Sequence, residues 1–214
     1  TFDKLAEEYL IYAKTEKKPK SYKEDVRMMN TFLLKRFSFK KLEEITTHEI
    51  QQLHHELRDT LYVANRVRSL LHRMFNLAIQ WKWMATNPVV GVKKYQEQKR
   101  NRWLDDEEVQ RLFSTLETYH NQSVANAVRL LLLTGSRKGE VLGATWDQFD
   151  LEKGVWTKPD HSTKQKKTEH LPLSLQVIEL LKDLKAKSPS PYLFPGKIPG
   201  KPFKDIKKGW KTTC

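Results

Sequence analysis

The residues best suited to chemistry form the segment TGSRKGE at positions 134–140. Arg137 and Glu140 stand three positions apart, directly after an apolar run and a Thr-Gly-Ser break. A guanidinium offers planar, paired donors that match two phosphate oxygens, and it stays charged at any relevant pH. Backbone N–H groups after the break would lie close to the same anion. The segment therefore predicts a phosphate contact, although a simple i, i+3 helix ion pair, worth about 0.2 to 0.5 kcal/mol, would use the same two residues.

This segment resembles the first active-site box of the tyrosine recombinases, the phage integrase family. The family pattern is T-G-x-R-x-x-E followed by a leucine, an aromatic and an acidic residue, and it is matched here by Thr134, Gly135, Arg137, Glu140, Leu142, Trp146 and Asp147. The resemblance implies that Arg137 contacts the scissile phosphate of DNA and that Glu140, one helical turn later, supports the site. It spans nearly all of the 214 residues and is strongest over residues 102–174.

A hairpin lysine is the next feature of the resemblance. The stretch VWTKPDHSTKQKKTEHLPLS, residues 155–174, is similar to the family's strand hairpin, in which a lysine on the turn acts at the scissile site. A mobile ammonium there can donate a proton to the departing 5′ oxygen when nearby cations lower its pKa. Lys164 aligns best with that lysine, and the alternatives are Lys166 and Lys167, which we otherwise expect to contact DNA. Lysines that are merely solvated and attract phosphate would show the same pattern.

The other catalytic parts of the family's site do not follow the hairpin. The second box, H-x-x-R, and the tyrosine nucleophile belong C-terminal to this region, and none of the seven tyrosines stands at the nucleophile's place. In the family, a tyrosine attacks a phosphodiester to give a 3′-phosphotyrosine link, and clustered cations stabilise the transition state without a metal ion or cofactor. We therefore expect a fragment of a site-specific DNA recombinase that binds DNA and cleaves nothing. The alternative is a non-catalytic DNA-binding protein that retains the architecture.

The balance of charge agrees with a nucleic-acid partner. Thirty-nine Lys and Arg residues against 26 Asp and Glu leave a formal charge of +13, and such an excess attracts polyanions. Charge alone is weak evidence, because ribosomal proteins, histone-like proteins and many enzymes share it. We expect double-stranded DNA as the partner, a multimer on that DNA, and no small-molecule substrate.

Metal and membrane classes find little support in the sequence. Cys214 is the single cysteine, so a disulfide or a cysteine-based zinc site cannot form within this chain. Histidines without convincing ligand spacing are expected at the surface or in a groove: His48, His54, His55, His72 and His120. No apolar run approaches the roughly 20 residues that cross a bilayer. We expect a cytoplasmic protein of bacterial or phage origin, associated with the nucleoid, that needs no cofactor.

Helices must position the candidate residues in the first part of the chain. Helical spacing predicts helices that begin near residues 2, 21 and 47, the third capped by the Thr47 hydroxyl. A fourth helix has the clearest buried face, formed by Val67, Leu70, Leu71, Met74, Phe75 and Ala78. No carboxylate occurs between Asp59 and Glu97, so cations on the opposite face lack local acidic partners. That face is predicted to contact DNA, unless it is simply solvated, through Asn65, Arg66, Arg68 and Arg73.

The second half of the chain changes its period. The polar segment 94–102 is predicted to link a helical core-binding domain, residues 1–93, to the front part of a catalytic domain, residues 103–214. Within that second domain, helical runs precede a small sheet, whose strands are expected at residues 145–149, 154–157 and 170–173, before a helix over residues 175–187. The expected fold class is mainly α with a small antiparallel β-sheet (α+β).

Overall fold

The computed structural model describes residues 1–99, 101–160 and 167–207. The chain divides into two compact units, Thr1–Asn101 and Arg102–Cys214, each with its own hydrophobic core. The boundary falls inside the segment predicted to be the linker. Among the described residues, no helix combines the length and the apolar character needed to cross a membrane.

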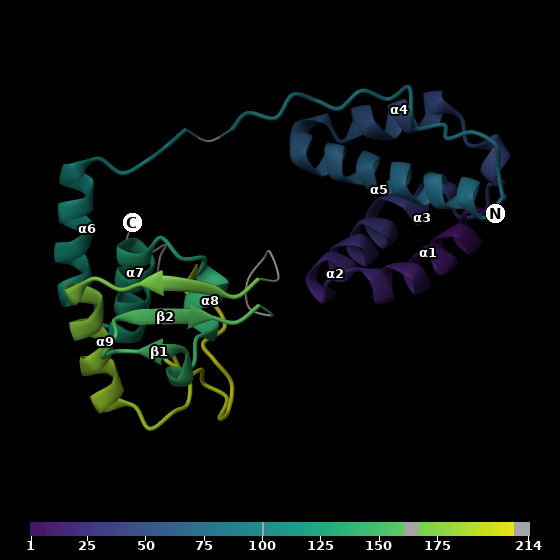
Figure 1. Ribbon diagram of the computed structural model, residues 1–214. Helices are drawn as coiled ribbons and strands as arrows, with labels where there is room; N and C mark the ends of the chain where they lie inside the picture. Colours follow the sequence, from purple (N-terminus) through teal and green to yellow (C-terminus); the bar gives the residue numbers. More distant parts are fainter. Residues whose placement is uncertain (100, 161–166, 208–214) are drawn as a thin grey trace. The chain divides into compact units, whose positions relative to one another are not determined.

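Unit 1 is helical (Figure 1). Its elements are α1 (Phe2–Glu16), α2 (Pro19–Met28), a π-helical turn (Met29–Leu33), α3 (Leu34–Phe37), a short 3-10 turn (Leu42–Glu44), α4 (Thr47–Glu56), a second such turn (Arg58–Thr60) and α5 (Leu61–Gln80). Pro19 occupies the first position of α2, where its missing N–H is not needed. The second helix therefore begins two residues before the predicted Ser21.

The predicted apolar stripe of α5 forms the centre of this unit's core. Its six residues are each at most 4% exposed. They pack with α1, whose Phe2 ring lies 6.3 Å from that of Phe75 and 5.6 Å from that of Phe37. Because burial of apolar area is the main favourable term in folding, this contact holds the polar face of α5 outward.

Helix α4 begins at Thr47 as predicted, but the predicted cap was wrong by one residue. The Thr46 hydroxyl accepts a hydrogen bond from the Glu49 backbone N–H at 3.3 Å, and the Glu49 carboxylate accepts one from the Thr46 N–H at 3.0 Å. This is a capping box, in which both partners lie outside the regular hydrogen bonds of the helix. Thr47 is the first helical residue and cannot serve as its own cap.

Unit 2 combines helices with a three-stranded antiparallel sheet of order β1-β2-β3 (Figure 1). Its elements are α6 (Asp106–Thr118), α7 (Gln122–Thr134), α8 (Lys138–Gly143), a 3-10 turn (Trp146–Gln148), β1 (Phe149–Asp150), β2 (Val155–Lys158), β3 (Glu169–Pro172) and α9 (Leu175–Lys187). Strands β2 and β3 pair from Val155 opposite Pro172 to Lys158 opposite Glu169. The predicted α+β class is confirmed, and the hairpin lies where the sequence placed it.

The first predicted strand, residues 145–149, was largely wrong. A 3-10 turn occupies most of it, and β1 has only two residues. The turn places Gln148 to receive a hydrogen bond from the Trp156 indole at 3.1 Å, while Thr145 pairs with Tyr192 in an isolated bridge. Partners distant in sequence therefore override the strand propensity of this run.

Candidate active site and nucleic-acid interface

The break before Arg137 is built by the end of α7. The Thr134 hydroxyl donates to the Leu130 carbonyl at 2.5 Å, and Gly135 follows in the left-handed region with φ of 61°. A left-handed residue at this place ends a helix, and glycine takes that conformation without a Cβ penalty. Two residues later, Arg137 is the N-cap of α8.

Arg137 and Glu140 form an ion pair, as the simpler interpretation of the sequence required. Nη1 of Arg137 lies 2.8 Å from Oε1 of Glu140. The pair is asymmetric, because the side chain of Arg137 is 52% exposed whereas that of Glu140 is 3% exposed. A solvated surface pair would leave both groups open to water. Here the carboxylate is part of the core and the guanidinium extends from it to the surface.

The backbone N–H of Arg137 also points to Glu140 rather than outward. It donates to Oε2 at 3.2 Å, which closes a capping box at the start of α8. For this one N–H, the expectation of a backbone donor near an external anion does not hold. The half-exposed arginine side chain is the group of Arg137 that can reach a phosphate.

Lys158, a residue that the sequence analysis did not single out, completes this cluster. Its Nζ lies 3.3 Å from Oε2 of Glu140, and its side chain is 3% exposed. The same ammonium lies 3.5 Å from the half-exposed Glu169 carboxylate and 4.8 Å from the centre of the Trp156 ring. Lys158 and the buried Trp156 are two positions apart on one strand, so both point to the same side. This alternation along the strand is the signal in the sequence that could have predicted a buried Lys158.

The pKa of Glu140 reflects two opposing effects. Burial by itself would raise this pKa, but hydrogen bonds from Arg137 and Lys158 outweigh it and hold the pKa below the ordinary value. The Glu140 carboxylate in turn raises the pKa of the Arg137 guanidinium. Glu140 is therefore ionised at neutral pH, and it is balanced by two cations.

The predicted hairpin lysines can be placed only in part. Lys164 and Lys166 lie outside the described residues. Lys167 is exposed, two residues before Glu169, with which β3 begins. Lys158 is the last paired residue of β2, and its partner Glu169 is the first residue of β3. The connection that carries the candidates therefore starts beside the Arg137–Glu140 pair.

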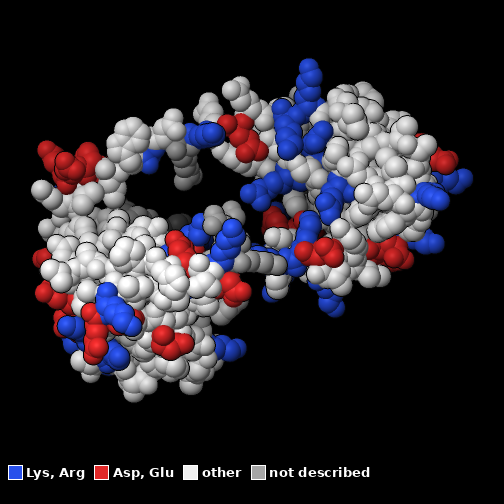
Figure 2. All heavy atoms as spheres, in the orientation of Figure 1, with Lys and Arg blue, Asp and Glu red and all other residues white. Residues whose placement is uncertain are grey.

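The polar face of α5 divides into two groups. Arg66 and Arg73 are exposed, and Arg73 donates to the Tyr12 hydroxyl at 2.7 Å. Figure 2 shows Lys and Arg side chains gathered on one side of unit 1. Arg68, by contrast, donates to the backbone carbonyls of Val92 and Val89, at 3.0 and 3.3 Å. Its guanidinium is thus engaged by the chain itself.

Asn65 is likewise engaged, and it is only 4% exposed. Its amide nitrogen donates to the Tyr95 carbonyl at 2.9 Å and to the Glu97 carboxylate at 2.8 Å. Its side-chain oxygen accepts from the Tyr95 N–H at 2.9 Å. Tyr62 donates to the Gln98 carbonyl from the same helix. Residues 92–98, which include most of the predicted linker, are therefore held along α5.

One of the described histidines is buried rather than exposed. Among the residues that the structure describes, no group of three or more His, Cys, Asp or Glu could hold a metal ion. The expectation that His54 lies at the surface was wrong, because it is 6% exposed and stacks on Tyr95 with ring centres 4.2 Å apart. Burial lowers the pKa of His54, so this ring is a packing partner of the linker.

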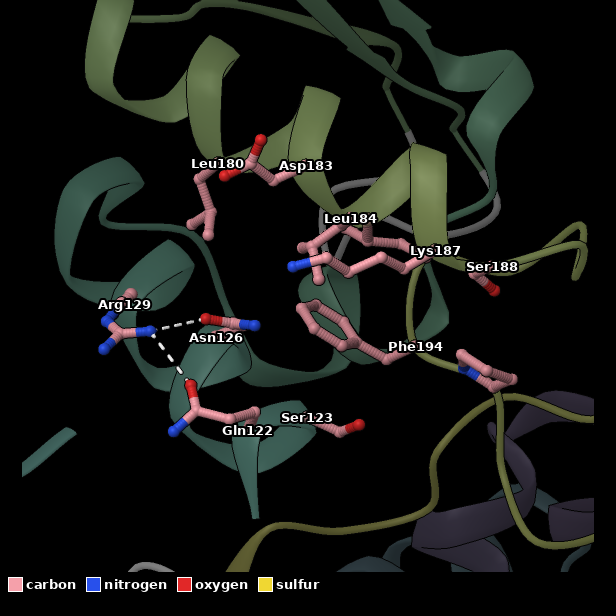
Figure 3. A pocket seen from close by; sticks show the side chains of 12 residues that line it. Gln122, Ser123, Asn126, Arg129, Leu180, Asp183, Leu184, Lys187, Ser188 and Phe194 are labelled. Carbon is pink, nitrogen blue, oxygen red and sulfur yellow. Dashed lines mark hydrogen bonds between the residues drawn. The ribbon is translucent and has the colours of Figure 1, made fainter. Parts of the chain in front are cut away.

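A separate pocket of about 450 Å³ lies between α7 and α9 (Figure 3). None of the candidate residues lines it. Two basic side chains line it, Arg129 and Lys187. Arg129 is turned toward its own helix, with Nη1 2.6 Å from the Asn126 side-chain oxygen and 3.4 Å from that of Gln122. The pocket is therefore distinct from the cluster around Arg137.

Comparison with known proteins identifies the family of this chain. Residues 102–213 match the phage integrase family, and residues 2–95 match the phage integrase central domain. The chain belongs to the phage integrase family. This match confirms the family predicted from the Arg137 segment. The roles of single residues stay predictions.

Two curated relatives illustrate the range of the similarity. Prophage integrase IntZ of Escherichia coli (strain K12) is 29% identical over 144 residues, which cover 65% of this chain and 36% of the relative. The shufflon-specific DNA recombinase of Escherichia coli is 35% identical over 116 residues, which cover 52% of this chain and 29% of the relative. The chain spans about one third of the length of these relatives.

Solved structures show the same fold at low sequence identity. A lambda integrase tetramer bound to a Holliday junction has a TM-score of 0.83 at 19% identity, covering 100% of this chain and 65% of that one. The Tn1549 transposon integrase in complex with transposon right end DNA has a TM-score of 0.83 at 16% identity, covering 100% of this chain and 77% of that one. At such low identity, the high TM-scores support a shared fold. The function must be argued from the site.

Proposed function

We propose that this chain is the DNA-binding part of a site-specific tyrosine recombinase that integrates or rearranges DNA. The observation that carries the proposal is the half-exposed Arg137 guanidinium, held by a buried carboxylate that a second cation also balances. A cation fixed in this way is suited to a phosphate, because it is oriented before the anion arrives. Family membership and relatives described as DNA-bound integrases supply the second support.

In this proposal, Arg137 contacts the scissile phosphate and stabilises the charge that develops on it during strand transfer. Glu140 sets the position of the guanidinium. Lys164 on the hairpin donates a proton to the departing 5′ oxygen. Lys166 and Lys167 contact the DNA backbone beside it. The chemistry requires neither a metal ion nor a cofactor, because the cations of the chain replace them.

The second DNA-contacting surface is the exposed part of α5. Arg66 and Arg73 supply phosphate contacts, since both are exposed. Asn65 and Arg68, which the sequence placed in the same group, act indirectly: they hold residues 92–98 in position. We therefore propose that these two residues shape the interface and do not contact DNA themselves.

The covalent step needs a tyrosine, and we propose that these 214 residues bind DNA without cleaving it. After the hairpin, Tyr192 is the one tyrosine in the sequence. Its backbone is held in a bridge with Thr145 and by a hydrogen bond from its N–H to the Ser190 hydroxyl.

The multimers described for lambda integrase, a dimer and a tetramer on DNA, suggest that this chain also assembles on double-stranded DNA. We propose that it does so in association with the nucleoid.

A salt-dependent binding titration tests the proposal. The chain is titrated into a fluorescein-labelled duplex at several salt concentrations, and anisotropy gives the affinity. The logarithm of the binding constant should fall linearly with the logarithm of salt, by about 0.9 per phosphate contact. Arg137→Ala should reduce the slope by one such contact and leave most of the affinity.

The matched control for this titration is Lys153→Ala, which removes an 81% exposed cation of the same unit from the turn before β2. We expect it to leave the slope unchanged. A chain that binds without salt dependence, or an Arg137→Ala variant with the slope of the parent, would contradict the proposal.

A further inference from the structure

We infer that Lys158 is a positioning residue for Arg137: its buried ammonium balances Glu140, so that the guanidinium remains available to a phosphate. This inference rests on the phosphate contact proposed for Arg137. It assigns to β2 a cation that takes part in the site without touching DNA.

The two oxygens of Glu140 divide the work between the two cations. Oε1 accepts from the Arg137 guanidinium at 2.8 Å, and Oε2 lies 3.3 Å from the Lys158 ammonium. The buried part of the cluster therefore contains one negative charge and a full positive charge at Lys158, while the charge of Arg137 extends to the surface. Glu169, the second partner of Lys158, is half exposed, so water screens much of its charge.

Without Lys158, the same geometry would restrict Arg137. Among the residues that the structure describes, the guanidinium would then be the one cation paired with the buried carboxylate, and the pair would be neutral as a whole. An incoming phosphate would then compete with Glu140 for the guanidinium. Because both Glu140 and Lys158 are 3% exposed, their interaction is poorly screened, and it can satisfy the carboxylate independently of Arg137.

Lys158 cannot take the part proposed for Lys164. A proton donor to DNA must reach the departing oxygen, but Lys158 is buried against Glu140, Glu169 and the face of the Trp156 ring. It also stands on the last paired position of β2 rather than on the turn. Its effect on DNA must therefore pass through Glu140 and Arg137.

The first experiment measures Glu140 in the free chain. Carbon-13 NMR of the carboxyl group follows its titration in the parent chain and in Lys158→Met, Lys158→Gln and Lys158→Arg. Loss of this nearby cation should raise the pKa of Glu140 in the Met and Gln variants, and the Arg variant should restore it. Lys158→Gln keeps a donor without the charge if Lys158→Met does not fold.

The other charged groups that face this cluster supply the control. Arg137 is present in every variant, and Glu169→Gln removes the exposed partner of Lys158. Because Glu169 is half exposed, Glu169→Gln should change the pKa of Glu140 far less than Lys158→Gln does. A purely structural lysine would leave the pKa of Glu140 in place, and that result would overturn the inference.

The second experiment is a double-mutant cycle on DNA binding, measured by anisotropy with the labelled duplex. Lys158→Met should weaken binding when Arg137 is present and should have no further effect in an Arg137→Ala chain, because the lysine acts through the arginine. Equal losses in both backgrounds would overturn the inference. If Arg137→Ala alone has no effect on binding, the proposed phosphate contact fails, and the Glu140 titration still decides the electrostatic role of Lys158.

Discussion

The two basic surfaces of this chain, the polar face of α5 and the cluster around Arg137, differ in how their cations are balanced. On α5 there are no neighbouring acids in the sequence, yet Arg68 is engaged by two backbone carbonyls. At Arg137 a glutamate stands three residues away, yet the guanidinium keeps about half of its surface exposed. The count of nearby acids therefore does not tell whether a cation is available. Backbone oxygens and buried lysines also decide it.

The difference extends to what each surface can do. Asn65 and Arg68 order residues 92–98, so part of the predicted linker belongs structurally to unit 1. Glu140 and Lys158 position a single guanidinium, that of Arg137, at the start of α8. The first arrangement shapes the backbone, and the second presents a charge.

The largest effect is expected for Glu140→Ala. This change leaves Lys158 buried without its buried partner, and breaking a buried ion pair in this way costs about 3 to 5 kcal/mol of unfolding free energy. Hydrogen exchange of the β2 and α8 amides would report the loss within unit 2. Glu152→Ala, which removes an exposed carboxylate of the same unit, is the control and should change little. A loss no larger than that of the control would contradict the prediction.

Asn65→Ala should have the next largest effect. It leaves the Tyr95 N–H and carbonyl without their side-chain partner, and each unsatisfied group costs about 1 to 3 kcal/mol when it stays buried. Residues 92–98 should detach, and trypsin should cut faster at Lys93 and Lys94. Gln80→Ala, at an exposed position at the end of α5, serves as the control. Unchanged cleavage would show that other contacts hold this segment.

The α5 arginines should separate in DNA binding. Arg66→Glu combined with Arg73→Glu removes two exposed cations, so the slope of log affinity against log salt should become shallower by about 1.8 if each contacts one phosphate. Arg68→Ala should instead destabilise unit 1 and keep the slope, because its guanidinium is bound to the backbone. If Arg68→Ala changes the slope as much as the double variant does, the division of this face is incorrect.

The smallest effect is a pH dependence of unit 2. The folded pKa of Glu140 lies below its ordinary value of 4.5, so its contribution to stability is fully present above that value and is lost as pH falls through the folded pKa. Each pKa unit of difference corresponds to about 1.4 kcal/mol. Urea unfolding of the chain between neutral and acidic pH, compared with Glu140→Gln, measures this contribution. Parallel pH profiles of the two chains would contradict it.

Features that depend on neighbouring residues could be predicted before the fold was known. The apolar stripe of α5 follows from helical spacing, the Gly135 turn from its residue type, and the β2–β3 hairpin from alternation. The position of Arg137 after a helix end followed in the same way, and so did the α+β class. Each of these features depends on a local pattern and not on tertiary contacts.

Which polar groups remain free depends on contacts between residues that are distant in the sequence. Arg68 meets carbonyls 21 and 24 residues away, and Asn65 meets a backbone segment 30 residues away. Lys158 lies on strand β2 and reaches Glu140 on helix α8. Hydrogen bonds and buried charges satisfy whichever group the fold brings close, and local sequence does not record that proximity. The availability of a cation is therefore a property of the folded chain.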